Sequence, residues 1–84
     1  MNIIYTKHAQ KKFSDLRLFG IFLTKPKIQS TIKMPKYKSS DNGNLIVSAS
    51  LDKDHNLRVV YYQERDVIIV ITFYIYKKGR YGEN

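Results

Sequence analysis

The chain has 84 residues, of which 15 are lysine or arginine and 7 are aspartate or glutamate, so its formal net charge at pH 7 is +8. A chain of this length buries only a small core, which excludes a deep substrate cavity. It contains no cysteine, which excludes disulfides and thiolate metal sites. The excess positive charge favours a polyanionic partner, such as nucleic acid, an acidic protein or an anionic membrane surface.

The start of the chain lacks the features of a targeting segment. Met1–Phe13 has neither the apolar stretch nor the cleavage site of a signal peptide, and no apolar run in the sequence is long enough to span a bilayer. We therefore expect a cytoplasmic protein that does not enter a membrane. We also expect a single domain over residues 1–84.

A short strand and a helix are predicted at the beginning. Asn2–Tyr5 is a candidate strand, and Thr6 is a candidate N-cap for a helix that ends near Leu18. His8 and Lys12 fall on the polar side of this helix. The residues predicted to face the core recur at spacings of four and three, at Ala9, Phe13 and Leu16.

A second helix and a polar loop follow. Thr24 is the candidate N-cap, Pro26 lies in the first turn, and the helix ends near Lys33. The segment Lys36–Asn44 is strongly polar, and we interpret it as a loop.

Three strands are predicted in the second half of the chain. Leu45–Leu51 alternates apolar with small or polar residues, Leu57–Gln63 follows a tight turn, and Val67–Tyr76 is dense in β-branched and aromatic residues. In the last strand one face is wholly apolar, and the other becomes more polar toward its end. We expect a single core to contain the helix stripe and that apolar face, through Ala9, Phe13, Leu16, Val59, Ile69, Ile71 and Phe73.

The register of the last hairpin decides which way Arg58 points. A loop with an odd number of residues places Arg58 on the same face as Thr72 and Tyr74. A loop of two or four residues would instead turn its guanidinium into the apolar face, because a shift of one residue reverses every side chain. Since an unpaired buried charge is costly, we predict the odd loop.

The order of these segments resembles the RelE and ParE toxin superfamily of small bacterial proteins. The resemblance rests on a first helix that opens with His-Ala and continues with two lysines, on the hairpin sequences LRVVY and VIIVIT, and on the terminal KKGRY. It is closest to an uncharacterised branch with an N-terminal His-Ala signature. The resemblance implies an α+β fold, with two N-terminal helices packed on one face of a twisted antiparallel sheet of three to four strands.

The same resemblance implies a function. It suggests the toxin of a toxin–antitoxin system, an endoribonuclease that cleaves mRNA alone or at the ribosome and is neutralised by a cognate antitoxin protein. Two alternatives stay open, because the superfamily includes proteins of differing activity. One is a catalytically silent module that binds nucleic acid or a protein partner, and the other is a gyrase-inhibiting toxin.

RNA cleavage without a metal needs groups that move protons and groups that stabilise charge on the phosphate. His8 is the candidate for proton transfer, because an imidazole exchanges protons near neutral pH. Arg58 is the candidate for charge stabilisation, and Thr72 shapes the same surface. The candidates for RNA binding are cations and aromatic rings, which hold phosphates and stack on bases: Lys12, Tyr74, Lys77, Lys78, Arg80 and Tyr81.

We expect no metal ion and no other cofactor. Asp52–Gln63 begins with the ligand spacing of a calcium loop, but it has leucine at the sixth position and glutamine at the twelfth. His8 and His55 lack a third and fourth partner for zinc.

Overall fold

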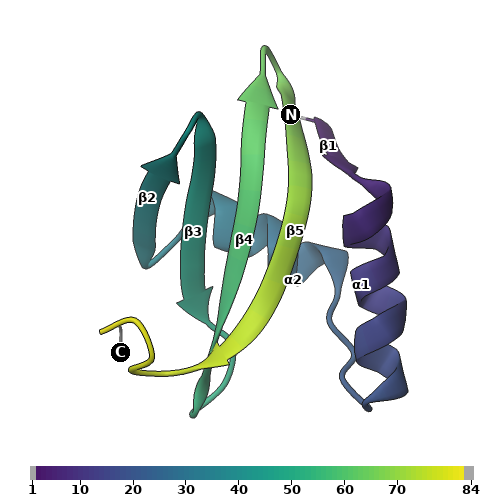
Figure 1. Cartoon of the computed structure of the whole chain (residues 1–84), viewed down its shortest axis with the longest axis vertical. Coiled ribbons are helices and arrows are strands. Elements are labelled where there is room, and N and C mark those ends of the chain that lie inside the picture. Colours follow the sequence, from purple (N-terminus) through teal and green to yellow (C-terminus); the bar gives the residue numbers. More distant parts are fainter. Residues whose placement is uncertain (1, 83–84) are drawn as a thin grey trace.

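The computed structural model describes residues 2–82, which form two helices and a five-stranded mixed sheet (Figure 1). The strand order is β1-β5-β4-β3-β2; β1 is parallel to β5, and the other neighbours are antiparallel. The elements in chain order are β1 (Asn2–Tyr5), α1 (Lys7–Leu18), α2 (Lys25–Lys33), β2 (Tyr37–Asp41), β3 (Asn44–Ser50), β4 (His55–Glu64) and β5 (Val67–Lys77).

Both helices begin at the predicted caps. The Thr6 hydroxyl accepts a hydrogen bond from the Ala9 amide at 3.1 Å, and the Thr24 hydroxyl accepts one from the Lys27 amide at 3.4 Å. Each bond satisfies one of the amides that have no partner within the first turn of a helix. The predicted ends near Leu18 and Lys33 are confirmed as well.

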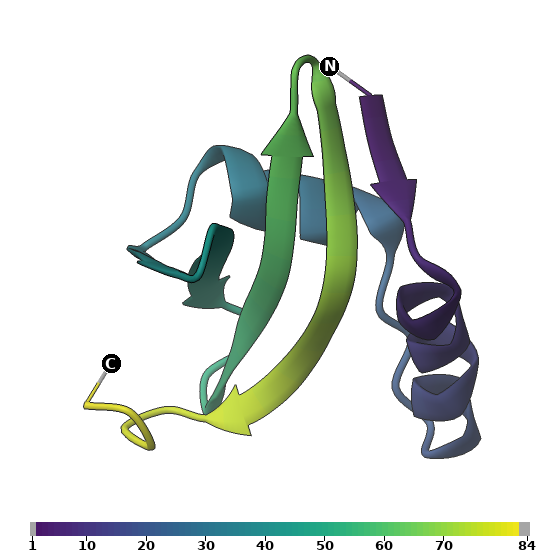
Figure 2. The same ribbon diagram turned by 45° about the horizontal axis from the view of Figure 1, so that its top comes forward.

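The helices divide the inner side of the sheet between them. α2 crosses behind β3 and β4, whereas α1 lies along the β1 and β5 side (Figures 1 and 2). Side chains from both helices join the inward face of the sheet in one core. The buried members of this core are Tyr5, Ala9, Leu23, Ile28, Ile32, Val47, Leu57, Val59, Tyr61, Ile68, Val70 and Phe73.

The predicted α+β class is confirmed, but the predicted sheet is wrong in two respects. The described sheet has five strands instead of three to four, and it is mixed because β1 pairs in parallel with β5. The predicted helix arrangement also differs, since α1 and α2 pack against different strands. The chain reaches this arrangement because β1 enters beside the last strand, and α1 follows it along the same side.

The predicted polar loop contains the missing strand. β2 and β3 form a hairpin around Asn42 and Gly43, whose φ angles of 51° and 84° are those of a tight turn that asparagine and glycine accept. The Asn-Gly pair is a local signal for this turn. β2 itself gives no strand signal, because it is an exposed edge strand whose residues do not alternate between apolar and polar.

The β4–β5 hairpin corrects the predicted loop but keeps its consequence. Glu64 pairs with Val67 across a two-residue turn, so the predicted odd loop is wrong. However, the register shifts between Val60 and Tyr61, where β5 contains one extra residue, Ile71. Because this β-bulge adds one residue to β5, Arg58 still lies on the same face as Tyr74. The two-residue turn alone would have placed them on opposite faces.

The bulge also changes which residues of β5 enter the core. Ala9, Val59 and Phe73 are buried as predicted, and Phe13 and Leu16 pack against the core. The prediction is wrong for Ile69 and Ile71. Before the bulge, the inward positions are taken by Ile68 and Val70 instead.

Candidate nucleic-acid interface

The face of the sheet opposite the helices, here called the open face, carries most of the predicted site. Arg58 pairs with Tyr74, and Val60 pairs with Thr72, so all four share one side of the β4–β5 ladder. The predicted proximity of Arg58, Thr72 and Tyr74 is therefore confirmed. We call the side chains that gather around Arg58 the basic-aromatic cluster; its members are Lys12, Arg58, Tyr74, Tyr76 and Tyr81.

Arg58 is the centre of the basic-aromatic cluster. Its Cζ atom lies 4.0 Å from the ring centroid of Tyr81, 5.0 Å from that of Tyr76 and 6.0 Å from that of Tyr74. A guanidinium that stacks on aromatic rings is held in place while its planar face and edges keep their charge. Arg58 is therefore presented as an ordered cation on an aromatic floor.

α1 brings a second cation to the same floor. Lys12 Nζ lies 5.9 Å from the ring centroid of Tyr74, so this ring contacts Lys12 and Arg58 alike. His8 is exposed and lies one helical turn before Lys12, which places both on one face of α1. The helix thus places His8 on the same face as Lys12, the residue that contacts the cluster.

The position of His8 is fixed by the bulge in β5. The Thr6 amide donates to the Val70 carbonyl at 3.1 Å, and the Thr6 hydroxyl donates to the Ile71 carbonyl at 2.9 Å. The same hydroxyl caps α1. One residue therefore attaches the first turn of α1, which carries His8, to the strand that carries Thr72.

The C-terminal tail, Lys78–Gly82, folds back on the open face. The Lys78 amide donates to the Asp54 carbonyl at 2.9 Å, and the Tyr81 ring meets the Tyr76 ring edge-on with centroids 4.9 Å apart. Arg80 Cζ lies 5.7 Å from the Tyr81 centroid. Of the predicted RNA contacts, Arg80 and Tyr81 join the cluster, whereas Lys77 is exposed at the end of β5, opposite His55.

A shallow hollow of about 210 Å³ continues from Arg58 toward the edge strand β2. Ser39 and Ser48 supply hydroxyl groups, and Lys38 lies at its edge. The full lining is Tyr37, Lys38, Ser39, Ile46, Ser48 and Arg58. Nearby, Lys36 Nζ lies 5.6 Å from the ring centroid of Tyr37. A chain of phosphates can therefore follow cations and rings from α1 across the sheet to β2.

The end of the open face near the β4–β5 turn exposes apolar side chains beside two charged ones. A hollow of about 720 Å³ is lined there by Ile4, Tyr62, Glu64, Arg65, Val67 and Ile69. Ile4 remains 53% exposed although it sits in a strand. An exposed apolar area of this kind is typical of a surface that contacts another protein.

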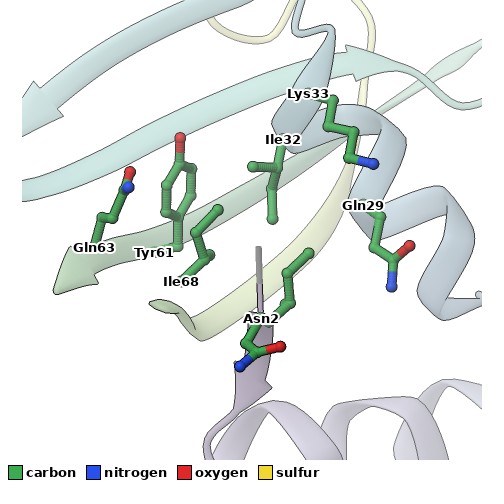
Figure 3. A pocket seen from close by; sticks show the side chains of 8 residues that line it. Asn2, Gln29, Ile32, Lys33, Tyr61, Gln63 and Ile68 are labelled. Carbon is green, nitrogen blue, oxygen red and sulfur yellow. The ribbon is translucent and has the colours of Figure 1, made fainter. Parts of the chain in front are cut away.

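A cavity of about 420 Å³ lies on the helix side, between α2 and the starts of β1 and β5 (Figure 3). Its floor is aliphatic and includes the Tyr61 ring, and its rim has three neutral amides, Asn2, Gln29 and Gln63, with Lys33 as the one charged group. None of the predicted site residues lines it. Its chemistry offers neither a phosphate clamp nor a proton-transfer group, so the basic-aromatic cluster is the better candidate for the polyanion site.

Sequence reasoning missed Tyr76 and Asn56. Tyr76 is buried on the open face beneath Tyr81, and Asn56 faces Tyr76 across the ladder. The alternation of Tyr74 and Tyr76 on one strand face was an available signal for the first. No local pattern singled out Asn56, because its burial depends on the register of β4 and β5.

Carboxylates contribute little to this surface. Within residues 2–82, no group of three or more histidine, cysteine, aspartate or glutamate side chains is arranged to hold a metal ion. Asp52 lies in the β3–β4 turn, where the Asp54 amide, followed by contacts with His55, holds the pKa of its carboxyl below the ordinary value.

In the described part of the chain, neither helix has the length and apolar character needed to cross a bilayer.

Comparison with known proteins adds no relative. No family model matches the sequence, and neither a curated protein nor a solved structure is similar to it.

Proposed function

We propose that this protein binds single-stranded RNA across the open face and cleaves it without a metal ion, as the toxin of a toxin–antitoxin pair. The observation that supports this most directly is the contact of Arg58 with three tyrosine rings, one of which also contacts Lys12. Rings that stack on bases, beside cations that hold phosphates, are the usual components of a single-strand binding surface.

The cleavage step assigns a role to each predicted catalytic residue. The ribose 2′-oxygen bonds to phosphorus, and the bond from phosphorus to the 5′-oxygen breaks, which leaves a 2′,3′-cyclic phosphate and a 5′-hydroxyl. His8 takes the proton from the 2′-hydroxyl, and water or a second side chain protonates the leaving oxygen. Arg58 stabilises the charge that develops on the phosphate, and Thr72 shapes the floor beside it.

Binding is tested by its salt dependence. If three or four cations contact phosphates, log affinity for a single-stranded RNA falls with log salt at a slope of about −2 to −3. Arg58→Ala weakens binding and flattens this slope, whereas Arg17→Ala, which removes the same charge from the exposed end of α1, has little effect. An affinity that does not change with salt would contradict RNA binding.

Cleavage is tested with the two histidines. The wild type, expressed without an antitoxin, arrests growth and leaves RNA ends with 2′,3′-cyclic phosphate, with or without ribosomes. His8→Ala lowers the cleavage rate by about 10²–10⁴-fold. His55→Ala is the matched control, because this histidine begins β4 and its ring contacts Asp52. Equal activity of the wild type and His8→Ala, both folded by thermal melting, would remove His8 from the mechanism.

The apolar end of the open face favours a second function, binding of a protein partner by a catalytically silent module. Ile4, Tyr62 and Ile69 line its hollow, next to the basic-aromatic cluster on the same surface. An amphipathic acidic segment, such as an antitoxin, would cover the aliphatic end and neutralise the cations. If the protein bound an acidic partner tightly and cleaved no RNA, this function would be established instead. Inhibition of gyrase would point to the third alternative.

A further inference from the structure

We propose that the side-chain amide of Asn56 recognises one unpaired base of the bound RNA, with a preference for adenine, when that base replaces the Tyr81 ring over Arg58. This inference rests on the RNA binding proposed above and names the part of the RNA that the cluster selects.

The observation behind it is a buried amide without a partner. The Asn56 side chain is 0% exposed, and neither Oδ1 nor Nδ2 forms a hydrogen bond within residues 2–82. Most buried polar side chains in folded proteins are hydrogen-bonded, because leaving such a group unsatisfied destabilises the fold. The amide at this position is therefore expected to find its hydrogen-bond partner in a bound ligand.

The location of Asn56 indicates what that use is. Asn56 lies two residues before Arg58 on the same face of β4, and it faces Tyr76 on β5 and Ser50 on β3. The Ser50 hydroxyl already donates to the Asp52 carbonyl at 3.2 Å. The amide therefore sits at the base of an aromatic site whose rings and guanidinium can sandwich a planar group.

The tail that covers this site is attached near its start. Its amides donate from Lys78 to the Asp54 carbonyl and from Arg80 to the Lys77 carbonyl, at the end of β5. Gly79 and Gly82, with φ of 90° and 76°, flank the segment that carries Tyr81. Tyr81 is itself 45% exposed, so its ring can leave without opening the core. A base in its place would regain the contacts with Arg58 and Tyr76.

The amide also determines which base fits best. A primary amide offers one donor and one acceptor side by side, which matches the adjacent amino group and ring nitrogen of adenine in a bidentate pair. Such a pair discriminates against other bases by about tenfold or more. The carboxylate of Asn56→Asp is an acceptor only, so this variant is expected to shift the preference toward guanine, which presents two adjacent donors.

The experiment measures binding and stability together. The probes are fluorescent pentanucleotides with four uridines and a variable central base, carrying 2′-O-methyl groups so that they cannot be cleaved through the 2′-hydroxyl. The wild type prefers the central adenine by about tenfold. Asn56→Leu keeps the side-chain size, reduces this preference to about twofold or less, and raises the melting temperature by about 4 °C or more, because it removes an unsatisfied polar group.

The matched control is Thr31→Val. Thr31 is equally buried, but its hydroxyl donates to the Lys27 carbonyl at 2.8 Å, on the opposite side of the sheet. This variant lowers the melting temperature and leaves the base preference unchanged. Wild-type binding without base preference, or an unchanged preference in Asn56→Leu, would overturn the role of Asn56 while RNA binding stands. A lower melting temperature of Asn56→Leu would show that the amide is structural, and no RNA binding at all would overturn both proposals.

Discussion

Tyr5 is the clearest case in which one buried atom costs stability. Its ring packs edge-on against Phe13 with centroids 5.7 Å apart, but its hydroxyl is buried without a hydrogen-bond partner among the described residues. Burial also raises the pKa of this phenol. The ring thus serves the core, and the hydroxyl is left unsatisfied.

Tyr5→Phe should therefore stabilise the protein. Removing an unsatisfied hydroxyl while keeping the ring is expected to add about 1 kcal/mol to the free energy of unfolding, which raises the melting temperature by about 4–8 °C for a domain of this size. Thermal melting followed by circular dichroism measures the shift. A decrease would show that the hydroxyl takes part in a stabilising contact.

Asp52 makes the stability of the β3–β4 turn depend on acid. Its Oδ1 accepts hydrogen bonds from the Asp54 and His55 amides, each at 2.8 Å, and these bonds lower the pKa of the carboxyl below its ordinary value. Since the folded-state pKa lies below the unfolded one, the carboxylate stabilises the fold fully at pH above the unfolded-state pKa. That contribution is lost as the pH falls through the folded value.

Asp52→Asn should remove this acid dependence. The variant is expected to be less stable than the wild type at pH 7 and to lose less stability between pH 5 and pH 2, because its amide does not titrate. Urea unfolding at several pH values gives both quantities. Parallel stability curves for the two proteins would assign the acid sensitivity to other carboxylates.

At the scale of elements, the bulge at Ile71 aligns the two halves of β5. Before it, Ile68 and Val70 point into the core; after it, Phe73 does, while Arg58 and Tyr74 stay on the open face. Deleting Ile71 forces one half of the hairpin to turn over. Either the core loses aliphatic side chains to solvent, or the Arg58 guanidinium enters it.

Deletion of Ile71 is expected to cost about 3 kcal/mol or more, a large part of the roughly 5–15 kcal/mol that stabilises a domain. Ile71→Ala keeps the residue count and should cost only about 1 kcal/mol, because this side chain is half-buried. Denaturant unfolding of both variants compares the free energy lost by changing the register of the hairpin with the free energy lost by shortening one side chain. Similar stabilities would show that the hairpin tolerates a different alignment.

The helices and the β4–β5 strands could be predicted from sequence, because caps at Thr6 and Thr24 and dense β-branched runs are local signals. The strand β2 could not, since it has no apolar face, and the parallel pairing of the predicted strand β1 could not, since its partner β5 lies at the other end of the sequence. Periodicity also misassigned Ile69 and Ile71, because a bulge interrupts the period of two without any distinctive residue. The same contrast holds for the candidate site. The cost of burying a charge predicted the face on which Arg58 lies, whereas the burial of Asn56 depends on the exact register of β4 and β5.

At the scale of the whole molecule, large apolar side chains are exposed as well as buried in the core. The end of α1 and the connection to α2 expose Leu18, Phe19 and Phe22, the last two by 81% and 74%. Together with Ile4, they expose much apolar surface for a protein with a small core. We interpret them as contact surface for another protein chain.

The pair of changes Phe19→Ser and Phe22→Ser tests this interpretation. Because both rings are exposed, the double variant should melt within about 2–4 °C of the wild type. It should also self-associate less at high concentration and bind a partner less tightly. Light scattering over a concentration series measures the first effect. A wild type that stays monomeric throughout and binds no partner would leave these side chains without a contact role.

The parallel pairing of β1 with β5 has a consequence for synthesis on the ribosome. Tyr5 lies beside Val70, and the Thr6 hydroxyl reaches the Ile71 carbonyl across 65 positions of sequence. At roughly 5–20 residues per second, the first strand waits about 3–13 s for its partner to be translated. During this interval Ile3 and Ile4 have no strand to pair with, and α1 has no bulge to anchor its cap. The nascent chain therefore completes its sheet and its candidate site only after β5 and the tail that follows it have been translated.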